Sequence, residues 1–345
     1  MSPIIWSILI TSLSTSTIIT MSSHHWLLAW LGLELNTLSM LPIIMKPHHP
    51  RSTEATMKYF LVQTLAAAMI LFASTLNAWQ TGVWTITNPT PTTTIIITLA
   101  VLMKLGAAPV HLWYPDVLQG ATLNTALLIS TWQKLAPIAL LYMMHNSLPT
   151  NLLLLTGLTS ALMGGWAGLN QTQTRKIMAH SSIAHMGWIM VALTTNPQLT
   201  TLTLLFYIIM TTAMFHTLNA STTKTISDMG TTWSTSPTTM TLALLTLTSL
   251  GGLPPLTGFM PKLLILNELT TKPLLPLATT MALASLPSLF FYVRMAYTTT
   301  LTTPPNTTNT EHKWRLKTTL TPTHTPTTTL ALLLLPLTPT MWTTT

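Results

Sequence analysis

The sequence LGGLPPLTG, residues 250–258, decides the fold, because it interrupts the longest apolar region of the chain. That region runs from Thr238 to Leu269, and as one α-helix it would be about 48 Å long, against about 30 Å for the core of a membrane. Two prolines and three glycines in nine residues disfavour a continuous helix. The sequence therefore predicts an interrupted helix here.

A related sequence, LGAAP at residues 105–109, interrupts another apolar region. Both segments fit the pattern Leu-Gly-x-x-Pro, and they begin 145 residues apart. A lysine lies near each of them, Lys104 at the first and Lys262 at the second. The pentapeptide alone is a weak signal, but interrupted helices at matching positions of two halves indicate a transport site.

The composition explains why these regions are read as membrane spans. Only 6% of the 345 residues are charged, whereas about a quarter is usual in soluble proteins, and 48% are hydrophobic. This excludes a soluble protein and a disordered one. The net charge of +8 comes from scattered basic residues, which does not indicate a nucleic-acid surface. The absence of cysteine excludes disulfides and thiolate metal sites.

We expect an all-α membrane protein with about eleven spans, two of them interrupted. Counting places the two breaks in spans 4 and 9, which is the fourth position of two five-span units. Since five is odd, the second unit enters the membrane from the opposite side, as in inverted-repeat transporters. We expect the units at 1–148 and 149–298, followed by a loop and a last span at 299–345. The expected spans are approximately 3–20, 24–45, 57–78, 93–112, 122–145, 149–169, 176–195, 199–220, 238–265, 274–298 and 324–342.

The basic residues predict the orientation of these spans. With the N-terminus inside, the outer loops hold only Lys272, and this asymmetry places the C-terminus outside. The inner loops and their borders then hold ten basic residues: Lys46, Arg51, Lys58, Arg175, Lys176, Lys224, Arg294, Lys313, Arg315 and Lys317. No signal peptide or Arg-rich transit sequence precedes the first span, so we expect synthesis inside the organelle if the protein is organellar.

Four charged residues remain inside spans: Glu34, Lys104, Lys134 and Lys262. An unpaired charge at the membrane centre costs about 3 kcal/mol or more, so such residues indicate a function by default. A buried lysine whose partner moves away can change its protonation, as a proton relay requires. The alternative is a static ion pair that holds helices together. His185, in mid-span, is a further relay candidate, whereas the roles of His111 and His180 stay open.

Two segments carry a resemblance to a known family: KLGAAPVHLWYPDVLQG at 104–120 and GGLPPLTGFMPK at 251–262. They resemble the signatures of the antiporter-like membrane subunits of respiratory complex I. LELN at 33–36 and WQKLAP at 132–137 also fit, and the chain is similar to vertebrate mitochondrial members over its whole length. The chain contains no phosphate loop and no dinucleotide-binding glycine motif.

This resemblance implies a core subunit of the proton-pumping membrane arm, in the mitochondrial inner membrane. It places Glu34, Lys104, Lys134 and Lys262 on the family's proton path, with His185 between the last two. It implies an N-terminus in the matrix and a C-terminus in the intermembrane space. NADH, flavin, iron–sulfur clusters and ubiquinone would be used on other subunits, and this chain would bind no cofactor. Its partners would be other membrane-arm and accessory subunits and inner-membrane phospholipids, and no nucleic acid.

Two other functions are weighed against this one. The first is a free-standing sodium/proton antiporter built on the same ancestral unit, which would work without NADH. The second is a scaffold subunit whose buried charges are static. The full-length resemblance favours the complex I subunit over the antiporter but does not exclude the scaffold.

Overall fold

The computed structural model describes residues 2–301 and 324–340, and within them it forms helices and no named strand. The expectation of an all-α protein is thereby confirmed for the described residues. The chain divides into two compact units, Met1–Ser160 and Ala161–Thr345. Lys313, Arg315 and Lys317, used above for the orientation, lie outside the described residues, as do the ends of the expected last span and its loop.

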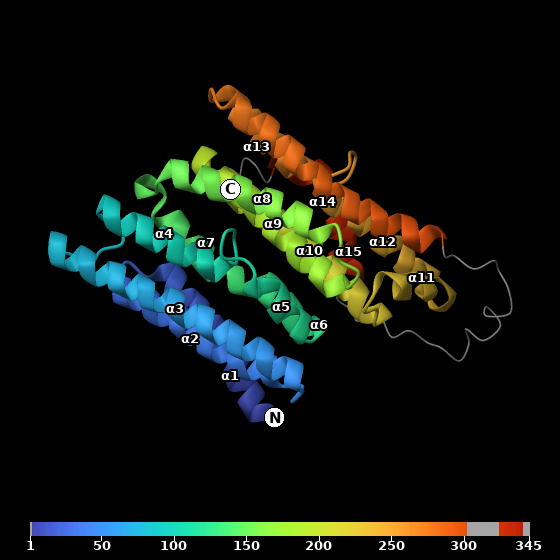
Figure 1. Cartoon of the computed structure of the whole chain (residues 1–345), viewed down its shortest axis with the longest axis horizontal. Coiled ribbons are helices and arrows are strands. Elements are labelled where there is room, and N and C mark those ends of the chain that lie inside the picture. Colours follow the sequence, from blue (N-terminus) through green and yellow to red (C-terminus); the bar gives the residue numbers. More distant parts are fainter. Residues whose placement is uncertain (1, 302–323, 341–345) are drawn as a thin grey trace. The chain divides into compact units, whose positions relative to one another are not determined.

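In its described residues, the first unit contains seven α-helices, two short 3₁₀ turns and the first part of α8, which can be followed in Figure 1. Their bounds are α1 Pro3–Ser22, α2 Trp26–Met45, α3 Pro50–Thr81, α4 Pro91–Leu105, α5 Trp113–Gly120, α6 Leu123–Ser130, η1 Trp132–Lys134, α7 Leu135–Met143, η2 His145–Ser147 and α8 Thr150–Gly168. Within this unit α2 packs against α1 and α3, and α3 also contacts α4 and α5.

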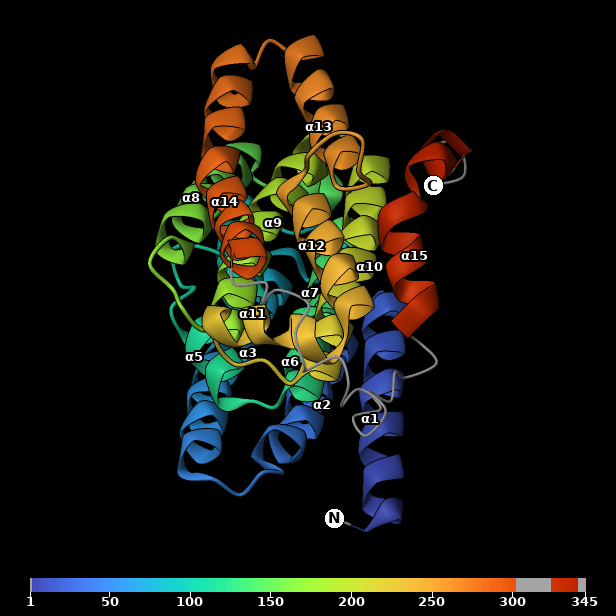
Figure 2. The same cartoon turned by 90° about the vertical axis from the view of Figure 1, so that its right-hand side faces the viewer.

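The second unit contains the rest of α8 and the helices that follow (Figure 2). Their bounds are α9 Thr174–Thr195, α10 Pro197–Ser221, α11 Ile226–Thr235, α12 Pro237–Gly251, α13 Phe259–Thr271, α14 Leu275–Leu301, α15 His324–Leu333 and η4 Leu335–Leu337. Here α10 contacts α9, α12 and α15, and α13 packs against α9, α10 and α14.

Proline starts many of these helices, because its fixed φ suits the first turn and its missing N–H is not needed there. Pro3, Pro50, Pro91, Pro197 and Pro237 all occupy such positions. Five of the 24 prolines thus begin helices without disrupting them.

Seven helical stretches in the described residues are long and apolar enough to cross a membrane. They are α1, α2, α3, α6–α7, α9, α10 and α14. Several of the other expected spans correspond to shorter or interrupted helices, such as α4 and α12 with 15 residues each. The total of eleven spans stays a prediction.

Both predicted breaks occur, and the two have the same local geometry. Gly106 ends α4 with φ +70°, and Gly252 ends α12 with φ +81°. In the first break Gly106 N bonds Met103 O and Ala107 N bonds Leu102 O. In the second, Gly252 N bonds Ser249 O and Leu253 N bonds Thr248 O. Each helix thus ends in a Schellman motif, which uses glycine because only glycine adopts positive φ without strain.

The structure aligns the two breaks with an offset of 146 residues, one more than the offset in the sequence pattern. Gly106 corresponds to Gly252 and not to Gly251, which still belongs to α12. The two left-handed glycines lie 146 residues apart, and Pro109 and Pro255 have the same separation. The sequence pattern could not distinguish Gly251 from Gly252, because only the backbone shows which one is left-handed.

A third interruption was not predicted. The expected span 122–145 is divided at Thr131 into α6 and α7, joined by the 3₁₀ turn η1, which ends at Lys134. Pro137 lies in the first turn of α7, where a proline cannot donate to the carbonyl four residues earlier. Gln133 is that residue, and this accounts for the local tightening of the helix.

Candidate functional site

Lys104 and Lys134 line the same small cavity of the first unit. Lys104 comes from the last turn of α4, immediately before the first break, and Lys134 from the turn η1. They are 6% and 2% exposed, respectively. The cavity measures about 20 Å³, and a volume of about 10–15 Å³ is enough for one water molecule. The structure therefore brings together two of the predicted site residues around a space of water size.

Polar side chains connect the helices that surround this cavity. Gln133 Nε2 donates to Asn36 Oδ1 at 2.9 Å, and Tyr59 Oη donates to Gln133 Oε1 at 3.3 Å. Gln63 Nε2 donates to the Lys104 carbonyl oxygen at 3.3 Å. All four side chains line the cavity. They come from α2, α3 and η1, so the hydrogen bonds fix the position of Lys134 relative to two neighbouring helices.

Aromatic rings form another part of the wall. The Lys134 ammonium lies 5.1 Å from the centroid of the Tyr114 ring, a distance at which a cation is attracted to the ring face. Trp113 packs edge-on against Tyr59 and Tyr114, with centroid distances of 5.9 and 5.6 Å. All three rings line the cavity together with the two lysines.

Glu34 lies near this cavity but is not among its lining residues. Its carboxylate interacts electrostatically with Lys104 and Tyr59. Glu34 Oε2 and Lys104 Nζ are buried, and neither has a hydrogen-bond partner in the described part of the chain. The two charges therefore attract each other through space without the direct ion pair that a static lock would require.

His185 and Lys262 line a second small cavity, of about 20 Å³, in the second unit. His185 comes from α9, and its ring lies 5.6 Å from that of Tyr207 on α10. Lys262 comes from the first turn of α13, just after the second break, and its Nζ donates to Gly251 O at 2.9 Å. The predicted residues thus fall into two groups, one in each unit.

The other histidines singled out from the sequence have different surroundings. His111 is buried in the first break, where its Nδ1 lies 3.3 Å from Pro109 O. His180 is buried in α9 and does not line the second cavity. These surroundings assign neither histidine a role in proton transfer.

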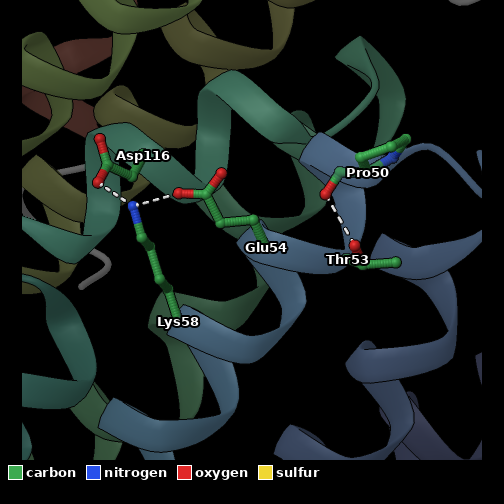
Figure 3. Close-up of polar contacts among 5 residues, drawn as sticks. All are labelled: Pro50, Thr53, Glu54, Lys58 and Asp116. Atoms are coloured by element: carbon green, nitrogen blue, oxygen red, sulfur yellow. Dashed lines mark hydrogen bonds and ion pairs between the residues drawn. The ribbon is translucent and has the colours of Figure 1, made fainter.

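A separate exposed cluster lies at the start of α3. The Lys58 ammonium contacts Glu54 Oε1 at 2.8 Å and Asp116 Oδ2 at 2.7 Å (Figure 3). Asp116 belongs to α5, so the cluster ties the helix that follows the first break to α3. These residues border a polar cavity of about 230 Å³. Exposed ion pairs contribute little to stability, and the cluster is separate from the buried lysines.

Sequence reasoning missed two residues of the first site, Tyr59 and Gln63. Gln63 had a signal, since it is an amide inside the apolar span expected at 57–78. Tyr59 had none, because a tyrosine near a span end is usually an interface anchor. No group of three or more potential metal ligands occurs among the described residues.

Comparison with known proteins identifies the family. Residues 23–287 match the family described as NADH:quinone oxidoreductase/Mrp antiporter, TM, and residues 289–342 match NADH dehydrogenase subunit 2 C-terminus. NADH-ubiquinone oxidoreductase chain 2 of Carassius auratus is 56% identical over 320 residues, which is 92% of each chain. The Salmo salar protein of that name is 54% identical over 343 residues, 98% of each chain.

A solved structure of respiratory complex I from Thermus thermophilus with bound aureothin contains a chain of the same fold. Its TM-score is 0.85 at 25% sequence identity, and the match covers 97% of this chain and 78% of that one. The resemblance drawn from the two interrupted helices is therefore confirmed. The chain belongs to the family of NADH-ubiquinone oxidoreductase chain 2, within the antiporter-like membrane proteins.

Proposed function

We propose that this chain is a core membrane-arm subunit of respiratory complex I that takes part in proton translocation. Electron transfer from NADH to ubiquinone on other subunits would drive this translocation. The proton path would consist of Glu34, Lys104, Lys134, His185 and Lys262. The family and the fold support membership of the complex, and the geometry of the two cavities supports the path.

The observation that carries the proposal is the cavity shared by Lys104 and Lys134. Two ammonium groups around one buried cavity repel each other, so a proton on one disfavours a proton on the other. A water molecule between them would allow a proton to pass. Two lysines serving only as scaffold would instead be expected in direct ion pairs, and Lys104 Nζ has no hydrogen-bond partner in the described structure.

In this proposal, Glu34 is the residue through which events elsewhere in the complex affect the two lysines. Its carboxylate attracts the Lys104 ammonium through space. Quinone reduction elsewhere in the complex would perturb this interaction, and a weaker attraction on Lys104 would in turn change the proton affinity of Lys134. The absence of a direct bond between Glu34 and Lys104 makes the interaction easy to modulate, since no hydrogen bond has to break first.

From Lys134 the proton would pass by way of His185 to Lys262, and then to an exit or to the next subunit. His185 and Lys262 line one cavity, which supports transfer between these two residues. A histidine suits an intermediate position, because its ordinary pKa near 6.5 allows it to accept and release a proton near neutral pH.

We propose the corresponding architecture as eleven spans in two inverted five-helix units, 1–148 and 149–298, with the loop and last span at 299–345. The matched Schellman motifs at Gly106 and Gly252 support the repeat. The N-terminus would lie in the matrix and the C-terminus in the intermembrane space, according to the distribution of basic residues.

The proposal places all redox cofactors on other subunits, and this chain binds none. NADH, flavin, iron–sulfur clusters and ubiquinone would be used elsewhere in the complex. The partners would be other membrane-arm and accessory subunits together with phospholipids of the mitochondrial inner membrane, without nucleic acid. The vertebrate mitochondrial relatives support this location.

Replacing Lys134 with methionine in the assembled complex tests the path. Methionine keeps the length of the side chain and removes its charge. We expect NADH oxidation by the complex to lose its coupling to proton transport while assembly survives. The measurement is the proton-to-electron ratio in vesicles, with Lys224→Met as the control, because Lys224 is exposed outside both cavities.

Each outcome distinguishes between the functions considered. A normal proton-to-electron ratio in Lys134→Met would leave the scaffold role and reject the path. The free-standing antiporter is tested on the native chain, by asking whether it co-migrates with an NADH-oxidising assembly on a native gel. A small band without NADH oxidation would reject membership of the complex.

A further inference from the structure

We propose that the two helix breaks are held closed by different hydrogen bonds, the first by the neutral amide of Gln63 and the second by the charged ammonium of Lys262. Only the second break would then loosen when its lysine loses a proton. We call the hydrogen bond from Lys262 Nζ to the Gly251 carbonyl oxygen the latch. This inference rests on the proposed function, in which Lys262 carries a proton.

The two breaks have the same backbone and therefore need the same stabilisation. Each Schellman motif leaves carbonyl groups of the last turn without a partner inside the helix. In water the solvent would satisfy them, but in a membrane interior a partner must come from the protein. The side chains that approach these carbonyls therefore decide how firmly each break is closed.

In the first break the partner is neutral. Gln63, from α3, donates its side-chain N–H to the Lys104 carbonyl oxygen. The neighbouring lysine does not take part, because Lys104 Nζ has no hydrogen-bond partner in the described structure. An amide has no protonation change in the physiological range, so this bond is independent of pH.

In the second break the partner is the lysine itself. Lys262 lies in the first turn of α13 and reaches back across the break, so that its Nζ donates to the Gly251 carbonyl oxygen at 2.9 Å. The positive charge stands at the C-terminal end of α12, where the helix dipole favours a cation. A charged donor makes a stronger hydrogen bond than a neutral one, and the bond weakens when the proton is lost.

The close approach of the lysine depends on Gly252. A Cβ atom at Gly252 would lie 3.0 Å from Lys262 Nζ and 3.1 Å from its Cδ, so the side chain passes directly over the glycine. At Gly106 of the first break this space is occupied by Tyr114, with its Cβ at 3.2 Å and two ring carbons at 3.3 Å. The same backbone is thus covered by a tyrosine in one unit and by a lysine in the other.

The surroundings of Lys262 allow its charge to respond to its neighbours. The titratable groups near it from the packed helices are His185 on α9 and Tyr207 on α10, which share its cavity, and Tyr292 on α14, which packs beside Gly251. Glu268, on α13 itself, lies six residues further along that helix. No carboxylate lines this cavity, so the hydrogen bond to the Gly251 carbonyl is the contact that favours the charged lysine.

Hydrogen exchange in the intact complex in lipid nanodiscs tests the proposal. The amides of Gly252 and Leu253 report on the second break, and those of Gly106 and Ala107 report on the first. After correction for the intrinsic exchange rate, protection of the second pair should fall as pH rises from about 6.5 to about 10.5, a range that ends at the ordinary pKa of lysine. Protection of the first pair should stay constant.

Four variants give matched comparisons. Lys262→Met should raise exchange at the second break by about tenfold or more at every pH, which is the fold-change for a lost hydrogen bond to a charged group. Lys262→Arg should keep the protection and remove its pH dependence, because arginine stays charged. Gln63→Leu should loosen only the first break, at every pH. His185→Gln should leave the pH dependence of the second break in place, which assigns that dependence to Lys262.

The results separate this proposal from the proposed function. Protection of the second break that does not vary with pH in the wild type overturns the latch, and this measurement needs no variant that might fail to assemble. If Lys262→Met loses proton transport but keeps wild-type protection, the latch is wrong and the path stands. If it loses protection but transports protons normally, the latch stands and the role of Lys262 in the path is wrong.

Discussion

Gly258 shows how closely the backbone segments of the second break approach each other. A Cβ atom at this position would lie 1.8 Å from the carbonyl oxygen of Ser249, in the last turns of α12. No side chain fits at that distance, although the φ of −67° would suit any residue. Glycine is therefore required here by space, whereas at Gly252 it is required by the backbone conformation as well.

We expect Gly258→Ala to destabilise the chain by about 1–3 kcal/mol, the usual cost of overpacking a well-filled site. The measurement is the shift of the thermal unfolding midpoint of the purified complex. Gly251→Ala is the matched control, since its Cβ would meet no atom closer than 3.7 Å and alanine favours a helix. Equal midpoints for the two variants would contradict the close approach.

Asp228 stabilises the start of α11, outside the membrane spans. Its Oδ2 accepts the backbone N–H groups of Thr225 and Lys224, at 2.9 and 3.2 Å, and Thr225 Oγ1 accepts the Asp228 N–H in return. These hydrogen bonds from Thr225 lower the pKa of the Asp228 carboxyl below its usual value of 3.8. The cap is therefore fully formed above that value and is lost as pH falls through the lower pKa of the folded state.

At neutral pH we expect Thr225→Ala to weaken the first turn of α11 by about 1 kcal/mol, which is typical of a lost N-cap. Amide exchange at residues 226–229 should then be about fivefold faster. Asp228→Asn should have an effect in the same direction at neutral pH and a smaller one in acid, where the wild-type carboxylate is protonated. Thr231→Ala, at an exposed position of the same helix, is the control. Unchanged exchange in Thr225→Ala would show that the cap is dispensable.

Among the helices, the α6–η1–α7 segment has the most direct consequence for the site. The 3₁₀ turn rotates the chain so that Gln133 contacts Asn36 and Tyr59 while Lys134 lines the cavity. Pro137 prevents this turn from relaxing into a regular α-helix, because it has no N–H for the Gln133 carbonyl. The proline, which itself lines the cavity, thus positions the lysine through the backbone of the turn.

We expect Pro137→Ala to lower the proton-to-electron ratio of the complex without preventing its assembly, since a regular helix would rotate Lys134 away from its position. The control is Pro42→Ala, which removes a proline inside α2 that lines neither small cavity. A ratio equal to that of the wild type would show that Lys134 does not depend on the interruption. NADH oxidation in the absence of a gradient separates this effect from loss of the enzyme.

For the molecule as a whole, the basic residues predict which side each loop faces. Lys46 and Lys224 are exposed, and both belong to the side predicted as inner, whereas Lys272 follows α13 on the predicted outer side. Within the described residues, Lys272 also donates to the Thr195 carbonyl oxygen at the end of α9. The ends of α9 and α13 therefore lie on one side, as the expected topology requires.

We expect an amine-reactive, membrane-impermeant reagent to modify Lys272 in mitoplasts and to leave Lys46 and Lys224 unmodified. In inverted inner-membrane vesicles the pattern should reverse, because the opposite face is then exposed. Peptide mass spectrometry of the modified lysines is the measurement, with detergent-solubilised complex showing which of them react at all. Modification of Lys224 in intact mitoplasts would contradict the predicted orientation.

The amino-acid sequence was sufficient for the helical class, the position of the two breaks and the identity of the buried charges. These follow from local causes: apolar length, glycine and proline in the breaks, and charges that no loop contains. Two further features are local in the same sense. Helices start at proline, and threonine hydroxyls donate to the carbonyl one turn back, as Thr98 Oγ1 does to Ile95 O. Each depends on residues within a few positions along the chain.

The tertiary structure was needed for the grouping of these charges and for the residues that hold them. Lys104 and Lys134 share a cavity because α3, α4 and η1 pack around it, and Tyr59 and Gln63 reach it from 41 or more residues away. The left-handed residue of the second break, Gly252, and the bond from Lys262 to Gly251 also depend on the folded backbone. Contacts between distant residues are set by packing, which no local pattern of the sequence contains.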